Sequence, residues 1–299
     1  MSEDGIGGIG EFLQSRRARI KPADVGLPGL GRRRVPGLRR EELAQLAGVS
    51  IDYYTRLERG RAHNVSDAIL TAIADVLRLD GTERQHLRDL ARPGGPASGP
   101  RSTSQSRTAS SQVRPGLARL LEMMDAVPAC VMGRRTDILA YNAMADALYG
   151  FSAMPARHRN AARHTFLHPG VHTFYADWSD VAEEAVAFLH LDAGRHPHDT
   201  RLAALIGELS LESTTFRTLW ARHPVRDKTY GTKRLHHPLV GDLELAYETL
   251  VLPGDADQCL VTYTPAAGSA SQERLQLLAS WQASTTPPLN TYNNADQAR

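Results

Sequence analysis

Cysteine is nearly absent from this sequence, which has only Cys130 and Cys259, far apart, in 299 residues. Two thiols without metal-type spacing argue against a disulfide scaffold and fit a reducing compartment. The first residues lack the basic segment and apolar core of a secretion signal. No apolar run reaches the ~20 residues that a membrane-spanning helix needs. These absences predict a soluble, cytoplasmic protein with no membrane partner.

A large net charge is also missing, because 35 Lys and Arg oppose 33 Asp and Glu, for a formal charge of +2. The charges are unevenly placed, however. Residues 14–61 carry twelve basic and five acidic side chains, whereas the rest of the chain carries 23 basic and 28 acidic ones. A basic N-terminal part joined to a slightly acidic remainder indicates a polyanionic partner for the first part alone.

Large apolar side chains are almost absent from residues 91–112, ARPGGPASGPRSTSQSRTASSQ, which are rich in Gly, Pro, Ser and Thr. Such a segment buries too little surface to offset its ordering entropy, so we predict a flexible linker. The length favours about two domains. We expect a first domain over 1–91, the linker over 92–112, a second domain over 113–270, and a C-terminal helix with a loose tail over 271–299.

Before the linker, the apolar pattern is helical throughout. A first helix is expected over residues 9–20, and RREELAQLAGVSIDYYTRLERG, residues 39–60, supplies a second and a third. Ser66 is placed to cap a fourth helix, and Thr82 with Gln85 to form a capping box for a fifth. Five short helices predict an all-helical bundle.

The 39–60 segment has the residue types that a helix-turn-helix requires. Ala44 is small where the two helices approach, Gly48 suits a left-handed turn, and Ser50 can cap the second helix. An ordinary helical hairpin also tolerates Ala, Gly and Leu at such places. Because the whole set occurs in register, we favour the helix-turn-helix.

The text LRREELAQLAGVSIDYYTRLERG, followed by LTAIADVLRLDGTERQHLRDLA, resembles the XRE (Cro and lambda-repressor-like) helix-turn-helix regulators. The resemblance implies a recognition helix in the major groove of double-stranded promoter DNA. Because one helix-turn-helix reads only a few base pairs, we expect a homodimer on two half-sites about one helical turn apart. It places Ile51, Asp52 and Arg56 at base edges, Tyr53 at the groove edge, and Arg39 and Arg40 at phosphates. The predicted DNA-binding residues are Arg32, Arg33, Arg34, Arg39, Arg40, Ser50, Ile51, Asp52, Tyr53 and Arg56.

The segment KPADVGLPGLGRRRVPG, between the first two helices, is longer than a simple helix-turn-helix needs. We predict that its three consecutive arginines, residues 32–34, reach the DNA backbone or a minor groove; a disordered loop is the alternative. Glu58 is expected to be a structural charge rather than a DNA contact.

After the linker, the pattern mixes helices with strands. A helix near 117–126 precedes two strands, ACVMGRR and ILAYN, and helices follow near 143–149, 178–193, 200–209 and 214–223. KRLHHPLVGDLELAYETLVLPGDADQCLVTYTP then predicts three antiparallel strands. The expected fold class is therefore α + (α+β), an N-terminal helical bundle joined to a five-stranded antiparallel sheet with helices on one side.

This second part resembles the MmyB-type ligand-binding domain, in PACVMGRRTDILAYNAMADALYG and in the long block FRTLWARHPVRDKTYGTKRLHHPLVGDLELAYETLVLPGDADQCLVTYTP. The resemblance implies a PAS-like fold and a small apolar ligand, fatty-acid-like or a specialised metabolite. Tyr141 stands where a tryptophan is expected, which alters one wall and adds a hydroxyl. The candidate ligand-binding residues are Tyr141, Asn142, Phe174, Trp178, Phe216, Arg217, Trp220, His223 and Tyr247.

Catalytic motifs are absent from the sequence, with no P-loop and no GxSxG. His164 and His168 lack the glutamate of HExxH, and the HPHD segment, residues 196–199, has no convincing third ligand. We therefore expect no enzyme, no metal site and no cofactor.

The combined prediction is a dimeric, sequence-specific transcription regulator with a small-molecule sensor domain that also mediates dimerisation. The resemblance favours an activator, which adds RNA polymerase as a partner. Two alternatives stay open. One is an enzyme that uses a C-terminal cavity and has the helix-turn-helix as a targeting arm, and the other is a helix-turn-helix joined to a ligand-free interaction domain.

Overall fold

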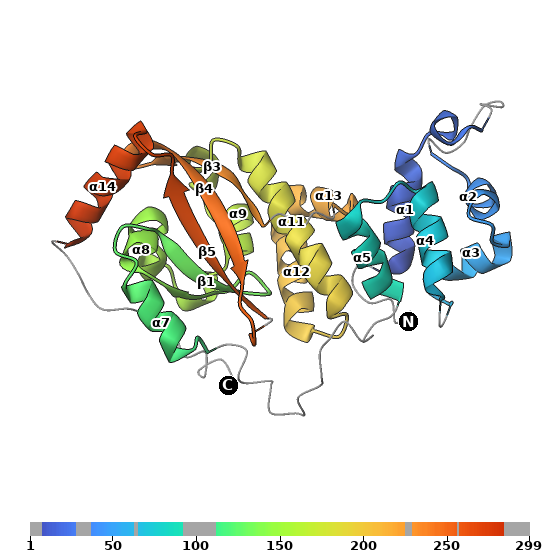
Figure 1. Ribbon diagram of the computed structural model, residues 1–299, viewed down its shortest axis with the longest axis horizontal. Helices are drawn as coiled ribbons and strands as arrows, with labels where there is room; N and C mark the ends of the chain where they lie inside the picture. Colours follow the sequence, from blue (N-terminus) through green and yellow to red (C-terminus); the bar gives the residue numbers. More distant parts are fainter. Residues whose placement is uncertain are drawn as a thin grey trace. The chain divides into compact units, whose positions relative to one another are not determined.

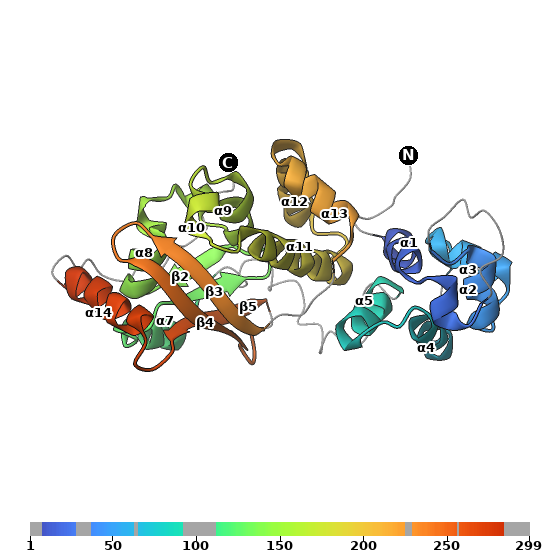
Figure 2. The ribbon, with the colours of Figure 1, turned by 90° about the horizontal axis from the view of Figure 1, so that it is seen from above.

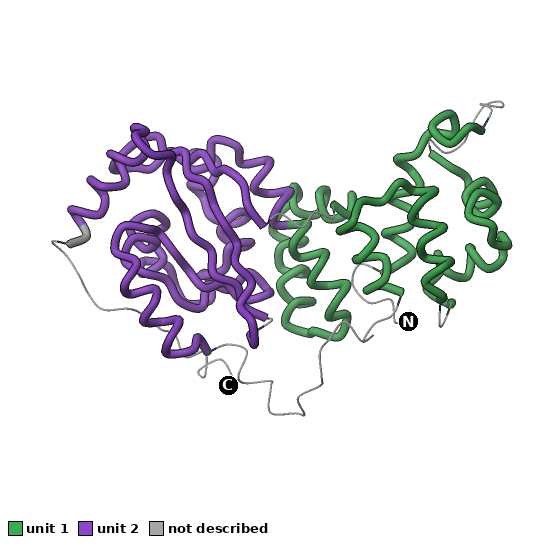
Figure 3. The backbone as a smooth tube through the Cα atoms, viewed as in Figure 1, with its two compact units in different colours: residues 1–100, 186–227 green, residues 101–185, 228–299 purple. Residues whose placement is uncertain are grey.

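The structure, a computed structural model, describes residues 8–27, 37–62, 65–91, 112–224, 229–255 and 257–283. They form two compact units (Figure 3). We call residues 1–100 with 186–227 the helical unit, and residues 101–185 with 228–299 the sheet unit. Residues 92–111 of the predicted linker and the predicted tail beyond 283 lie outside the described residues.

The N-terminal part of the helical unit is built from helices, as the pattern predicts (Figure 1). They are α1 (Ile9–Arg19), the 3-10 turn η1 (Pro22–Val25), α2 (Arg40–Leu46), α3 (Ile51–Glu58), α4 (Asp67–Val76) and α5 (Gly81–Ala91). Phe12, Leu43, Tyr54, Leu57 and Ile73 are each at most 1% exposed and form the centre of their shared core.

The turn between α2 and α3 has the predicted geometry. Gly48 has φ +68°, a left-handed conformation in which a Cβ is strained. The amide of Val49 donates to the carbonyl of Ala44 at 3.0 Å, and the Ser50 hydroxyl accepts from the amide of Tyr53 at 3.2 Å. The helix-turn-helix geometry and the Ser50 cap are thus confirmed.

The later caps agree in part with the prediction. The Ser66 hydroxyl accepts from the amide of Ile69 at 3.4 Å, so the predicted cap of α4 is confirmed. The capping box of α5 was placed on the wrong pair. The Asp80 carboxylate accepts from the amide of Glu83 at 2.8 Å, and the Glu83 carboxylate accepts from the amide of Asp80 at 3.2 Å. An earlier start is favoured because Asp80 follows the buried Leu79 directly.

Three helices from the second half of the sequence extend the helical unit. They are α11 (Trp178–Arg195), which passes from the sheet unit into the helical unit, α12 (Thr200–Glu212) and α13 (Thr214–Ala221). Leu191 of α11 is 5% exposed and belongs to the same apolar core as α1 to α5. The core of the N-terminal helical bundle therefore includes a residue about 100 positions later in the sequence.

The sheet unit contains β1 (Ala129–Gly133), β2 (Ile138–Tyr141), β3 (Tyr230–His237), β4 (Gly241–Val251) and β5 (Gln258–Pro265). These strands form one antiparallel sheet in the order β2-β1-β5-β4-β3. Figures 1 and 2 show the late strands β3, β4 and β5 side by side. The predicted five-stranded antiparallel sheet is confirmed.

Helices cover both faces of the sheet, whereas the prediction placed them on one side. Besides the start of α11, they are α7 (Pro115–Glu122), α8 (Ala143–Tyr149), α9 (Ala161–Leu167), α10 (Val171–Phe174) and α14 (Ala270–Ala283), with 3-10 turns η2 (Phe151–Ala153) and η3 (Ala156–His158). Val261 and Tyr263 of β5 join the core that contains α8 and α14, whereas Leu260 joins Leu117 and Leu121 of α7. Because side chains alternate along a strand, α7 packs on the opposite face.

The short helices α9 and α10 lead the chain to the outer edge of β3. Tyr175 bridges Leu235 in antiparallel fashion, and the amide of Ala176 donates to the carbonyl of Arg234 at 3.0 Å. Asp177 then pairs with the Arg234 guanidinium. These contacts protect part of an edge that would otherwise present unpaired backbone groups.

We predict that Gly10→Ala destabilises the helical unit by about 1–3 kcal/mol. A Cβ on Gly10 would lie 2.0 Å from the carbonyl oxygen of Glu58, a backbone atom that cannot rotate away. Gly81→Ala, at the start of α5, is the matched control, because nothing lies within 4 Å of its added Cβ. Denaturant unfolding curves of both variants test the prediction, and equal midpoints would contradict it.

Candidate functional site

The first turn of α3 is open to solvent, as base recognition requires. Ile51 is 44% exposed, although it is apolar, and Asp52 and Arg56 are also exposed. Opposite them, Tyr54 and Leu57 are buried in the bundle core. An amphipathic helix with one buried face thus presents its predicted base-facing residues on the other.

Arg56 does not stand alone on this surface. Its guanidinium lies 5.8 Å from the ring centroid of Tyr53, within the range of a cation–π contact. Tyr53 is half-buried, and its backbone amide is fixed by the Ser50 cap. The ring therefore limits the directions that the Arg56 side chain can take.

Glu58, at the end of α3, is a buried charge with two basic partners. Its carboxylate is 3% exposed and lies 3.1 Å from both Arg17 of α1 and Arg40 of α2. Arg17 also donates to the carbonyl of Leu38, which precedes α2. The expectation that Glu58 is structural agrees with this geometry, since it ties three elements together.

The predicted phosphate-binding arginines differ in their surroundings. The Arg40 side chain is 47% exposed and shares the Glu58 carboxylate, whereas Arg39 lies on the surface beside Glu41 at 3.7 Å. The backbone amide of Arg39 donates to the Glu42 carboxylate at 2.7 Å, which closes a capping box for α2. Arg32, Arg33 and Arg34 lie outside the described residues.

Four predicted ligand-binding residues meet in one apolar core of the sheet unit. Tyr141, Phe174, Trp178 and Tyr247 all belong to the cluster on the α8 and α14 face of the sheet. Tyr141 is 4% exposed and its ring lies 5.1 Å from that of Phe151. The Trp178 indole donates to the carbonyl of Thr165 at 2.8 Å, which fixes the start of α11.

Asn142 is fully engaged in the fold. Its amide oxygen accepts from the amides of Ala129 and Ala145, at 3.0 and 2.9 Å, and its nitrogen donates to the carbonyls of Met124 and Val127. This network caps α8 and closes the turn before β1. We therefore do not carry Asn142 into the proposed ligand site.

Three further tyrosines in this core have no counterpart among the predicted residues. Tyr149 stacks on Phe151 at 5.4 Å and lies 5.4 Å from the ring of Tyr263, and Tyr175 is 7% exposed. Burial raises the pKa of all three phenols above the ordinary value. The cluster thus combines apolar rings with phenols that stay neutral, a composition suited to a weakly polar ligand.

The remaining predicted ligand residues lie on α13 or directly after it and belong to the helical unit. Arg217 is exposed and donates to the carbonyl of Ser210 at 3.0 Å, and Phe216 is fully buried. Trp220 stacks on His190 of α11 with ring centroids 3.6 Å apart. His223 lies 4.4 Å from the His190 ring, and its carbonyl accepts from Arg16 of α1 at 2.7 Å. The structure thus places His223 between α11 and α1 of the helical unit.

The histidines considered as metal ligands have other neighbours. His164 stacks on His168 at 4.8 Å, and burial lowers the pKa of His164 to about 4. His196 pairs with Asp192 one turn earlier, at 2.8 Å. Across the described ranges, no group of three or more His, Cys, Asp or Glu side chains is arranged to hold a metal ion.

The sequence alone did not identify α1 as the helix that contacts both α3 and the residue after α13. In the sequence, the adjacent α1 residues Arg16 and Arg17 look like ordinary surface charges of a basic helix. In the structure they are only 2% and 9% exposed. Their partners, His223 and Glu58, are far away in the sequence. The one local signal was the pairing of a basic doublet with the apolar Phe12 and Leu13 in the same two turns.

Comparison with known families connects this geometry to a function. A family model described as the MmyB-like transcription regulator ligand-binding domain matches residues 113–278, more than half of the chain. The chain belongs to the MmyB-like transcription regulators. A helix-turn-helix domain model matches residues 9–87. A search of curated proteins found no match.

These domains make the MmyB-like regulator a DNA-binding transcription regulator with a ligand-binding domain. Both domains are those of a transcription regulator. In the part of the chain that the structure describes, no helix has both the length and the apolar character needed to cross a membrane.

We predict that acid loosens the helical unit between about pH 6.5 and pH 4. Burial lowers the pKa of His86 to about 3 and that of His223 to about 4, so the folded state resists protons that the unfolded chain accepts below pH 6.5. The contribution of these neutral histidines to the free energy of unfolding is therefore fully present above pH 6.5. As the pH falls below 6.5, the free energy of unfolding decreases by up to about 1.4 kcal/mol per pH unit for each histidine.

Hydrogen exchange of α5 and α13 amides from pH 7.5 to 5, corrected for intrinsic exchange, measures this loss. His86→Leu should reduce the pH dependence, whereas substitution of the exposed His158 by Gln should leave it unchanged. A pH dependence that is the same in all three proteins would contradict the assignment.

Proposed function

We propose that this MmyB-like regulator is an XRE-type, sequence-specific promoter-binding protein that acts as a homodimer and responds to a small apolar ligand. The observation that carries the proposal is the solvent-exposed N-terminal turn of α3, presented by a complete helix-turn-helix beside a ligand-binding domain. Proteins with this pairing of domains couple a chemical signal to DNA occupancy.

In the proposed complex, α3 enters the major groove with its first turn against the bases. Ile51 packs on a thymine methyl, Asp52 accepts from a cytosine amine, and Arg56 donates to guanine. Ser50, Arg39 and Arg40 contact the backbone near the start of their helices, and Tyr53 supports Arg56 at the groove edge. The described part of the site agrees with these roles, because every side chain named is exposed or half-exposed.

Dimerisation supplies affinity that one small reading helix lacks. A single helix-turn-helix contacts only a few base pairs, so two half-sites about one helical turn apart bring the specific affinity into the usual range. We assign the dimer contact to the ligand-binding domain. Activation, through a contact with RNA polymerase, follows from the likeness to activators with this pairing of domains.

The ligand is proposed to lie among the aromatic side chains of the sheet unit. Tyr141, Phe174, Trp178 and Tyr247 belong to one cluster with the neutral phenols of Tyr149, Tyr175 and Tyr263. Such surroundings favour an apolar body with a hydrogen-bond-accepting end, such as a fatty-acid-like molecule or a specialised metabolite.

We predict that Arg56→Ala weakens binding to a selected operator by about 1–3 kcal/mol and relaxes preference at one base pair. The operator is obtained by selection from random duplexes with the full chain, and affinities are measured at several salt concentrations. Arg59→Ala, exposed just beyond the end of α3, is the control. An equal loss on every sequence would assign Arg56 to a phosphate instead.

We predict that native mass spectrometry of the purified protein shows a dimer with one organic molecule per chain, released under denaturing conditions. Phe174→Ala should reduce its occupancy, because this half-buried ring belongs to the proposed aromatic site. Leu239→Ala, on the exposed β3–β4 turn, is the control for an apolar truncation. If the occupancy of the bound molecule is the same in Phe174→Ala as in the unsubstituted protein, the ligand binds elsewhere.

A further inference from the structure

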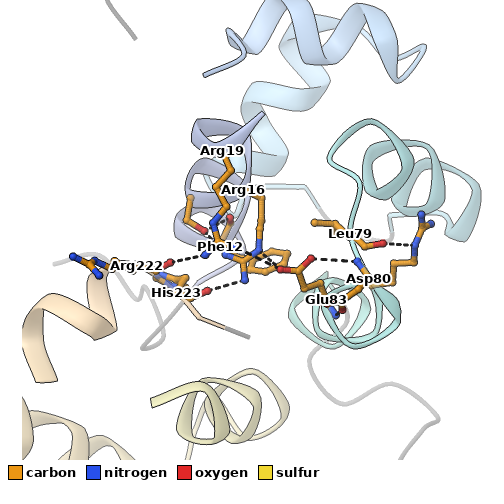
Figure 4. A network of polar contacts seen from close by, with 10 residues as sticks. Phe12, Arg16, Arg19, Leu79, Asp80, Glu83, Arg222 and His223 are labelled. Atoms are coloured by element: carbon orange, nitrogen blue, oxygen red, sulfur yellow. Dashed lines mark hydrogen bonds and ion pairs between the residues drawn. The ribbon is translucent and has the colours of Figure 1, made fainter. Parts of the chain in front are cut away.

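One face of the DNA-binding bundle, formed by α1 and α5, is occupied by the ligand-binding domain's own helices. Arg16 of α1 donates to the carbonyl of His223 just after α13, and Arg19 donates to the carbonyl of Arg222 at 3.4 Å (Figure 4). On α5, Asp89 pairs with Arg195 at the end of α11, at 3.3 Å. We call this set of contacts the α1/α5 face.

Arg16 is the polar centre of this face. Its guanidinium is buried between Glu83 at 2.8 Å, the His223 carbonyl at 2.7 Å and the ring of Phe12, whose centroid is 4.5 Å away (Figure 4). Burial lowers the pKa of Arg16 to about 10. The partners offset the desolvation of the charge only while α13 stays in place, because one of them comes from that segment.

Three buried imidazoles add a desolvation cost to the free energy of forming the same face. Neither ring nitrogen of His86 has a hydrogen-bond partner in the described structure, although the residue is 1% exposed. His190 and His223 are 1% and 3% exposed, and burial lowers the pKa of each. His223 also has φ +48°, which is unusual for a residue with a Cβ. Opening the face would hydrate these groups and relieve this strain.

Favourable packing opposes these costs. Leu191 enters the bundle core, and Gly194 brings the backbone of α11 directly against the His86 ring. A Cβ at position 194 would lie 2.6 Å from the Cε1 atom of that ring and 2.8 Å from its Nδ1 atom. His86 cannot move freely, since Phe12 packs on it edge-on with centroids 5.1 Å apart. The face therefore combines close fit with high desolvation cost, as expected of a contact that can open.

Helices α11 and α1 connect this face to the sheet unit and to α3, respectively. α11 begins in the sheet unit, where Glu184 contacts Lys233 at 3.1 Å and the Tyr247 hydroxyl at 3.3 Å, and it ends beside α5. On α1, the adjacent residues Arg16 and Arg17 hold different partners, the first α13 and the second Glu58 at the end of α3. Arg16, which contacts the residue that follows α13, is thus adjacent in the chain to Arg17, which pairs with Glu58 of α3.

We propose that the α1/α5 face is a releasable docking surface for α11 and α13, through which the ligand-binding domain controls the placement of α3. The proposal rests on the DNA-binding function proposed above. Docking leaves Ile51 and Arg56 exposed, so it acts on the position of the reading helix rather than by covering it. Opening frees α1 from α13 and loosens the support that α1 gives to α3.

The test uses Gly194→Ala in the full chain, with Gly207→Ala as a matched control. Both glycines lie inside helices, but nothing lies within 4 Å of a Cβ built on Gly207 of α12. We expect α5 and α13 amides to exchange about tenfold faster in Gly194→Ala, with the strands of the sheet unit unchanged. The control should behave as the unsubstituted protein does.

A second variant separates a specific clash from general damage. His86→Ala removes the ring that a Cβ at position 194 would strike, so the double variant should regain slow exchange. If Gly194→Ala leaves exchange unchanged, or if the double variant exchanges faster than Gly194→Ala, the releasable contact is overturned.

The DNA arm uses the selected operator with the same four proteins. Gly194→Ala should weaken operator binding about tenfold, and the double variant should restore it. Faster exchange with unchanged operator affinity would overturn the coupling. Failure of the unsubstituted chain to prefer any operator would overturn the proposed function, and the exchange comparison would then still decide whether the face opens.

Discussion

A single buried carboxylate holds α3, the proposed recognition helix, in its place. Glu58 ends α3, is almost completely enclosed, and is matched by Arg17 from α1 and Arg40 from α2. Removing the Glu58 carboxylate would leave the buried charge of Arg17 without its ionic partner, which is among the costliest defects that a small core can have. The close approach of Gly10 to the Glu58 carbonyl shows how little room the arrangement leaves. The position of the helix that we propose to read the bases therefore depends on this buried ion pair.

The sequence predicted what is local and repetitive. Gly48 and Ser50 were identifiable because a turn and a cap impose residue types at fixed offsets, and the late strands alternate because one face is buried. Even local rules failed where two caps competed, since Asp80 with Glu83 and Thr82 with Gln85 both fit a capping box. The prediction of helices on one face was wrong because α7 packs on the other face, over the strands near β1. The sequence of an eight-residue amphipathic helix shows that it has an apolar side but not which face of a sheet that side will contact.

Partners that are distant in the chain were beyond prediction. Arg16 and Arg17 look alike in the sequence, yet one is paired with α3 and the other with the end of α13. Trp220 was predicted as an aromatic wall of a ligand pocket and His223 as a polar group that holds the ligand, and the structure places both with His190 and Arg16 in the helical unit. Charge and aromatic character were visible in the sequence, but the packing that gives them a role depends on how α11 to α13 fold back.

The membership of residues 186–227 in the helical unit bears on how the protein can be divided. A family boundary drawn at residue 113 separates the two domains along the sequence, but it does not separate their cores. A fragment ending at residue 91 would leave Phe12 beside the space of the missing Leu191, and its complement would present Leu191 to water. Fragments cut in the linker would therefore tend to self-associate through the exposed apolar surface. The DNA affinity of the N-terminal fragment would then be that of a domain with an incomplete core, not that of an intact domain released from regulation.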